Sequence, residues 1–299
     1  MSVVFEGVVP AVVTPFTSDE RFSASAMESL LERLYTAGCH GVYVCGQTGE
    51  GLLQPLEMRQ QVAEVSLKNS PKGKSVIVHA GAARTEDAIS LVRHASKIGV
   101  HAVSSLPPAG NYTFEEIRAY YEALSAASDV PVLVYFFPEM SPAIRSTEQI
   151  LDLCSIPNVV GLKFTDFDLF KLSLIQRGGH VIYNGRDEIF AAGLLMGACG
   201  GIGSFYNLVP RLFVEVYEHS RSGRWNEARM VQDRINDLIA IGLEYPLFPA
   251  IKTILRWSGI DCGPCLAPRR SLTEAEEHDL RLALRRREFD ESAFLSAAA

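Results

Sequence analysis

The chain has 299 residues, of which 47% are hydrophobic and 21% are charged, and its formal net charge is −7. A chain this long and apolar can bury a large core, which excludes an intrinsically disordered protein. An acidic chain without a strong basic cluster binds nucleic acid poorly, so we expect no nucleic-acid partner. The length fits either two domains or one α/β barrel with an extension.

The opening segment MSVVFEGVVPAVVTPF lacks a basic region, and Glu6, Pro10 and Pro15 interrupt its apolar run. We therefore expect no signal peptide. No apolar stretch approaches the ~18 residues of a membrane-spanning helix, so we expect no membrane partner. The cysteines are dispersed along the chain, which predicts reduced thiols and a cytoplasmic location. The CxxC of Cys262 and Cys265 has no second pair beside it, so we expect structural thiols and no metal site.

Apolar, β-branched runs alternate with amphipathic segments through the first two thirds of the chain. The predicted strands are 8–13, 41–44, 75–80, 102–106, 131–136, 159–163, 180–184 and 200–204. The predicted helices between them are 25–37, 55–68, 85–98, 113–127, 147–154, 166–176 and 188–196. In 85–98 the apolar residues share one helical face. Thr113 and Glu116 have the spacing of a capping box, which begins a helix.

The eight strand-like runs recur about every 25 residues, which is the spacing of successive βα units. Their continuous apolar character is typical of parallel strands buried on both faces. Eight units without a GxGxxG after the first favour a closed (β/α)8 TIM barrel of the α/β class over an open sheet. Only helices are predicted beyond residue 205, at 209–220, 225–242, 248–257 and 273–287. We predict a catalytic barrel over 1–205 and a helical extension over 206–299, packed on the barrel.

Catalytic residues of such barrels lie where the strands end and in the loops that follow them. Lys163 closes an apolar run, so its amine is expected to point into the top of the barrel. Burial favours the neutral amine, which can attack a carbonyl and form a Schiff base. The alternative is a lysine that snorkels at the barrel rim.

The loop 46–51 after the second strand is rich in glycine but lacks the GK[ST] ending of a nucleotide-binding loop. Its backbone N–H groups, together with Thr48, are expected to form a cradle for a carboxylate. The alternative is that Gly46 and Gly49 only shape a tight turn.

Two further strand ends carry polar residues. Tyr135 ends the fifth strand and is placed to relay protons beside an amine, although core packing also accounts for it. Asp187 and Glu188 follow the seventh strand, where two carboxylates repel phosphate and suit hydroxyl groups. The alternative is that these acids only begin the next helix.

Together these residues resemble the pyruvate-dependent class I aldolase family that contains dihydrodipicolinate synthase and N-acetylneuraminate lyase. The resemblance covers essentially the whole chain and includes PAVVTPF at 10–16, GQTGE at 46–50, Tyr135 with Pro138, GLK at 161–163 and GGIGS at 200–204. It implies a Schiff base at Lys163 with no cofactor or metal. It further implies that Thr48 and Gly49 hold the substrate carboxylate and that Tyr135 moves the proton. The family also implies a homotetramer that acts on a small keto acid or sugar acid.

Within the family, YNGRDEIF at 183–190 and GIGSFYN at 201–207 resemble the N-acetylneuraminate lyases. This resemblance implies that the sugar-acid tail is bound by Thr165, Gly185, Asp187, Glu188 and Ser204. The synthases carry an arginine at the position of Met140, which argues against dihydrodipicolinate synthesis. The resemblance implies cleavage of N-acetylneuraminate to pyruvate and N-acetylmannosamine.

Two positions depart from the family pattern. Gln47 stands where the family usually has a Ser or Thr that relays protons, so we expect it to line the substrate site without a relay role. The loop 107–112 is one residue shorter than the loop that presents a tyrosine to a neighbouring subunit, which leaves the reach of Tyr112 open. Three alternatives remain: an aldolase or dehydratase for another 2-keto-3-deoxy sugar acid, a dihydrodipicolinate synthase-like protein, and a non-catalytic sensor of such acids.

Overall fold

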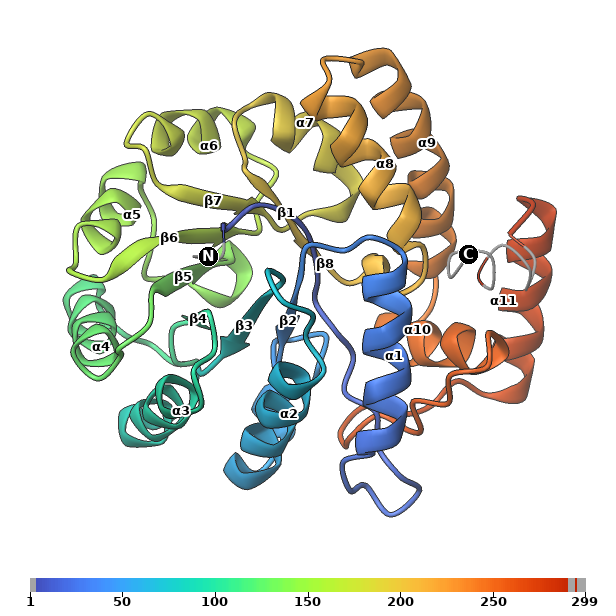
Figure 1. The fold of residues 1–299 in the computed structure, drawn as a ribbon, viewed down its shortest axis with the longest axis horizontal. Helices are drawn as coiled ribbons and strands as arrows, with labels where there is room; N and C mark the ends of the chain where they lie inside the picture. The colour runs from blue at the N-terminus through green and yellow to red at the C-terminus, as the bar shows by residue number, and fades with distance from the viewer. Residues whose placement is uncertain (1–3, 290–293, 295–299) are drawn as a thin grey trace.

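The computed structural model describes residues 4–289 and 294, and their strands form a barrel surrounded by helices (Figure 1). The strands are β1 (Gly7–Pro10), β2 (Gly41–Val44), β3 (Ser75–His79), β4 (Ala102–Ser105), β5 (Val132–Phe136), β6 (Val159–Phe164), β7 (Val181–Asn184) and β8 (Gly200–Gly203). They pair in parallel in the order β1-β8-β7-β6-β5-β4-β3-β2. A parallel bridge between Ala11 and Tyr43 brings β1 beside β2, so the sheet nearly closes on itself. The predicted (β/α)8 TIM barrel is confirmed.

A helix follows each strand. These helices are α1 (Ala24–Thr36), α2 (Leu56–Lys68), α3 (Thr85–Ile98), α4 (Phe114–Ala126), α5 (Thr147–Cys154), α6 (Leu169–Gln176), α7 (Phe190–Leu195) and α8 (Pro210–Arg221). The predicted bounds of α3 and α5 are confirmed, and Thr113 forms its capping box with Glu116. Helix α6 begins later than predicted because Asp168 caps it, accepting a hydrogen bond from the Lys171 N–H at 2.9 Å. The short 3-10 helix η3 (Asp187–Ile189) delays the start of α7.

Helices α9 (Trp225–Gly242), α10 (Leu247–Trp257) and α11 (Glu274–Arg286) complete the described chain and gather on one side of the ring (Figure 1). Helix α9 packs on α7 and α8 and contacts η3 at the barrel mouth, whereas α8 packs on β1. The division of the chain at residue 205 stays a prediction. Among the residues that the structure describes, no single helix is long and apolar enough to cross a membrane; α9 and α10 together reach that length, with a bend of 111° between them.

The alternation of side chains along the strands decides which residues enter the barrel. On β5, Leu133 and Tyr135 belong to the small core inside the barrel, while Val132, Val134 and Phe136 join the larger core under the helices. On β6, Leu162 and Phe164 likewise face the helices. The same alternation turns Lys163 inward, directly beside Tyr135 in the register of the two strands.

Candidate active site

A pocket of about 180 Å³ opens where the strands end. Nine of the ten predicted site residues line it: Gln47, Thr48, Tyr135, Lys163, Thr165, Gly185, Asp187, Glu188 and Ser204. Gly49 is the exception and lies behind the wall. Its carbonyl oxygen accepts hydrogen bonds from Thr14 Oγ1 at 2.7 Å and Gln54 Nε2 at 2.5 Å. Nine of the ten residues therefore lie together in one pocket, whereas the roles expected of them and of the Gly49 backbone stay predictions.

A larger cavity, of about 510 Å³, lies beside α10 and contains none of the predicted site residues. Its buried cation is Lys252, which already pairs with Glu50 at 2.8 Å and donates to the Pro264 carbonyl at 2.7 Å. A lysine engaged in this way serves structure, because a buried charge requires its partner. We therefore assign the chemistry to the smaller pocket.

Lys163 lies at the floor of that pocket with only 4% of its surface exposed. Its Nζ is 4.1 Å from the ring centroid of Tyr135 and 4.9 Å from that of Tyr43. These two rings hold the amine in position, where it could attack a carbonyl that enters the pocket.

The ring of Tyr135 is held on three sides. It stacks on Phe137 at a centroid distance of 6.3 Å and meets Tyr43 and His79 edge to face, each at 6.1 Å. His79 is fully buried, and burial together with the charge of Arg59 holds its pKa well below the ordinary value. Its Nε2 accepts a hydrogen bond from the Leu106 N–H at 3.0 Å. A neutral His79 therefore serves as packing for the tyrosine ring.

The loop after β2 is held in place by contacts of Glu50 with the C-terminal part of the chain. Glu50 adopts a left-handed backbone conformation, with φ of 57°, and its carboxylate turns away from the pocket. That carboxylate meets Lys252 at 2.8 Å and accepts from the Leu266 N–H at 2.8 Å. At the pocket itself, Thr48 Oγ1 lies 2.6 Å from Ser204 Oγ. Helix α10 and the segment that follows it thus hold the loop whose Thr48 lines the pocket.

Asp187 is 6% exposed, and its Oδ2 accepts a hydrogen bond from the Phe205 N–H at 2.8 Å. Burial raises the pKa of this carboxyl to about 7; the charge of Glu188 acts in the same direction, and the Phe205 N–H acts against it. A carboxyl that titrates near neutrality can both donate and accept hydrogen bonds, as hydroxyl groups require. A Cβ on Gly203 would lie 1.7 Å from Asp187 Oδ1, so any residue other than glycine at this position would clash with the carboxyl group.

Thr165 and Gly185 make the wall between β6 and β7. The buried Oγ1 of Thr165 has no hydrogen-bond partner among the described residues. A Cβ on Gly185 would lie 2.1 Å from this oxygen. The glycine therefore gives the threonine hydroxyl room to face the pocket.

Side chains of helix α9 hold the backbone around Asp187 and Glu188, a role that was not predicted from the sequence. Gln232 Nε2 donates to the Asp187 carbonyl at 3.0 Å, and its Oε1 accepts from the Ala191 N–H at 2.9 Å. One turn further on, Asn236 Nδ2 donates to the Glu188 carbonyl at 3.1 Å. The one sequence feature that could have indicated this role is the pair of amide side chains, Gln232 and Asn236, one turn apart on an otherwise amphipathic helix. The predicted extension thus holds the acidic wall of the pocket.

The pocket mouth holds residues from several loops. Arg186 and Phe137 line it, together with apolar side chains of α9 and α10, although the sequence does not single them out. Gln47 Nε2 contacts the sulfur of Met140. Tyr112 is exposed and does not line the pocket of this chain. Within residues 4–289, no group of three or more His, Cys, Asp and Glu side chains is placed to hold a metal ion.

Comparison with known proteins identifies similar chains over nearly the full length. Residues 4–287 match the Dihydrodipicolinate synthetase family. N-acetylneuraminate lyase of Rhizobium meliloti is 35% identical over 93% of this chain and 94% of its own. N-acetylneuraminate lyase 2 of Escherichia coli O6:H1 is 33% identical over 96% and 95%. The wild-type sialic acid aldolase of Ruminococcus gnavus superposes with a TM-score of 0.91 at 27% identity, covering 97% of this chain and 99% of its own.

Proposed function

The chain belongs to the dihydrodipicolinate synthetase family, and from this premise we propose that it is a Schiff-base carbon–carbon lyase. Its proposed reaction is the cleavage of N-acetylneuraminate to pyruvate and N-acetylmannosamine. The observation that carries the proposal is the position of Lys163 beside Tyr135, in a pocket that Asp187, Glu188 and Ser204 also line. The amine that would react with the keto group thus shares a pocket with polar groups that can bind the hydroxyl groups of a polyol. The names of the similar lyases from Rhizobium meliloti and Escherichia coli support the same substrate.

In the proposed mechanism, Lys163 Nζ attacks the C2 carbonyl, and loss of water leaves a protonated imine. Thr48 holds the neighbouring carboxylate. Tyr135 passes the proton of the C4 hydroxyl to that carboxylate as the C3–C4 bond breaks. The electron pair of the bond moves into the imine and forms an enamine, while C4 leaves as the aldehyde. Protonation at C3 and hydrolysis then release pyruvate and regenerate the amine.

The polar wall would orient the rest of the substrate. Asp187, Glu188 and Ser204 offer hydrogen bonds to the hydroxyl groups, and the free Thr165 Oγ1 offers another. Holding the polyol aligns the breaking bond with the imine, which converts binding energy into rate. Met140 offers no charge for a second carboxylate, which supports a sugar acid over the substrate of a dihydrodipicolinate synthase.

The same proposal includes a cytoplasmic homotetramer. All six cysteines are free thiols, which suits a reducing compartment. Light scattering of the purified chain tests the assembly: the expected mass is four times that of the chain, and a monomer contradicts this part of the proposal.

A substrate panel tests the function. Release of pyruvate is followed with N-acetylneuraminate and with other 2-keto-3-deoxy sugar acids, and Lys163→Met serves as the inactive control. We expect the highest kcat/KM with N-acetylneuraminate. Faster turnover of another sugar acid would assign the alternative aldolase, and binding without turnover of any of them would assign the sensor.

A further inference from the structure

Arg186 lies at the pocket mouth, between Gly185 and Asp187. Apart from Lys163, it is the only cation among the residues that line this pocket in the described part of the chain. Its side chain is 19% exposed, and its buried Nε has no hydrogen-bond partner among the described residues. A guanidinium has five N–H donors and no acceptor, so at a pocket lining it favours a ligand that brings a hydrogen-bond acceptor.

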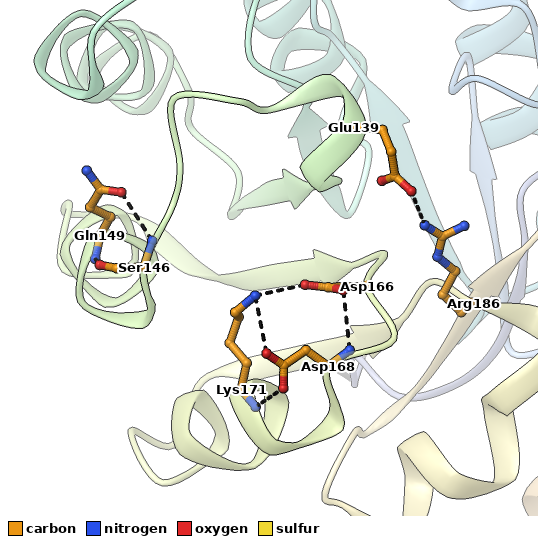
Figure 2. A network of polar contacts seen from close by, with 7 residues as sticks. All are labelled: Glu139, Ser146, Gln149, Asp166, Asp168, Lys171 and Arg186. Atoms are coloured by element: carbon orange, nitrogen blue, oxygen red, sulfur yellow. Dashed lines mark hydrogen bonds and ion pairs between the residues drawn. The ribbon is translucent and has the colours of Figure 1, made fainter.

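The guanidinium is held in a fixed plane. Its Cζ lies 4.5 Å from the ring centroid of Phe167 and 5.2 Å from that of Phe137. Its Nη2 donates to Glu139 Oε1 at 2.6 Å, an ion pair that joins the loops after β5 and β7 (Figure 2). Stacking on aromatic faces suits Arg better than Lys, because the guanidinium is planar and weakly hydrated.

The loop that carries Phe167 is itself fixed. Lys171 Nζ donates to Asp166 Oδ2 at 2.9 Å and lies 3.5 Å from Asp168 Oδ2, so one ammonium ties both neighbours of Phe167 (Figure 2). Asp168 also caps α6. The aromatic wall beside Arg186 is therefore preorganised before a ligand arrives.

The charges around Arg186 select the kind of acceptor. Glu139 already balances the guanidinium, and Glu188 lines the same pocket. A carboxylate or phosphate of the ligand would meet the repulsion of both acids, whereas a neutral carbonyl oxygen would not. We propose that Arg186 forms a subsite for a neutral hydrogen-bond acceptor on the aldehyde half of the substrate, the carbonyl oxygen of an acylamino group. Arg186 would thereby determine the preference for acylated sugars.

This inference rests on the proposed function, since it assigns one contact of that substrate. Its test is the reverse reaction, in which the enzyme joins pyruvate to N-acetylmannosamine or to mannose. Arg186→Met keeps the length and the apolar stem but removes the donors. We expect the KM for N-acetylmannosamine to rise about 10- to 100-fold, the range for a hydrogen bond to a charged group. The KM for mannose is expected to change less than about threefold, since mannose lacks the acyl carbonyl. Equal effects on both sugars, or no effect on either, would overturn the subsite.

Glu139→Gln is the matched control. It removes the charge of the ion pair and leaves the guanidinium in place, so we expect the preference for N-acetylmannosamine to persist. Loss of the preference in Glu139→Gln would show that Arg186 acts only through the ion pair, which overturns the proposal. Thermal unfolding and labelling of Lys163 by pyruvate and borohydride check that both variants are folded.

Failure of the proposed function can be distinguished from failure of the Arg186 subsite. If the wild-type enzyme joins pyruvate to neither sugar, the lyase proposal is wrong. The subsite is then tested by titrating the two sugars into enzyme whose Lys163 carries the reduced pyruvate adduct. Tighter binding of N-acetylmannosamine in the wild type, lost in Arg186→Met, supports the subsite. Equal binding of the two sugars to the wild type contradicts it.

Discussion

Thr48 Oγ1 and Ser204 Oγ lie 2.6 Å apart, so hydroxyls from the loops after β2 and β8, the two strands that flank β1, meet at the barrel mouth. In the proposed mechanism Thr48 binds the carboxylate of the keto acid and Ser204 binds the polyol. The residues that recognise the two halves of the substrate therefore support each other.

This contact predicts coupling between Thr48→Val and Ser204→Ala. Each change removes one partner of the hydrogen bond and should lower the free energy of unfolding by about 1 kcal/mol. The double variant should lose less than the sum, because the second change removes a group that no longer has its partner. Urea unfolding of the four proteins measures the cycle. Kinetically, Thr48→Val should raise mainly the KM for pyruvate, and Ser204→Ala that for the sugar. Strict additivity in both measurements would contradict the coupling.

The raised pKa of Asp187 predicts a pH dependence of stability. Burial moves this pKa from 3.8 to about 7. Between these values the native state keeps a proton that the unfolded chain has released, so the free energy of unfolding falls as the pH rises. Asp187→Asn removes the titration. Its stability relative to the wild type should increase with pH across this window, by up to about 1.4 kcal/mol per unit.

Urea unfolding at several pH values between about 4 and 8 measures this difference. Glu188→Gln is the control: it removes a charge that raises the pKa of Asp187 in the folded state, so the upper end of the window should move to lower pH. A constant difference between Asp187→Asn and the wild type at every pH would show that Asp187 does not titrate in this range.

The wall between β6 and β7 predicts a rescue. A methyl group on Gly185 would lie 2.1 Å from Thr165 Oγ1, so Gly185→Ala should lose about 1–3 kcal/mol of stability through overpacking. Adding Thr165→Ala removes the opposing hydroxyl and should restore part of that loss. The rescue should be incomplete, because the Thr165 Cα and the Phe164 carbonyl would still lie 3.0 Å from the methyl group. Thermal unfolding measures the stability of both variants. A double variant that is less stable than Gly185→Ala alone would contradict this packing.

Gln232 predicts that the C-terminal helices serve the active site. Gln232→Met leaves the Asp187 carbonyl and the Ala191 N–H without their partner, at about 1–3 kcal/mol each. We expect lower stability together with a higher KM for the sugar and continued labelling of Lys163 by pyruvate. Arg229→Met, on the exposed face of α9, is the control and should change stability by less than about 0.5 kcal/mol. If Gln232→Met changes stability but not the sugar KM, the residue does not position Asp187.

The local pattern was sufficient to predict the barrel, and the strand ends together with the family resemblance predicted half of the residues that line the pocket. The strand alternation that turns Lys163 and Tyr135 inward is periodic in the sequence, and strand ends of a parallel barrel necessarily meet at one face. Contacts between distant segments leave no such pattern. The pairing of Glu50 with Lys252 and the amides of Gln232 and Asn236 depend on how α9 and α10 pack on the mouth. The role of Arg186 could not be predicted from the sequence, because it depends on aromatic rings from two other loops.

The most direct test of the central claim is to trap the Schiff base. The enzyme is incubated with pyruvate and borohydride, digested, and the reduced adduct is located by mass spectrometry. We predict one adduct, on Lys163, and none in Lys163→Met. An unlabelled protein, or an adduct on a different lysine, would contradict a Schiff base at Lys163.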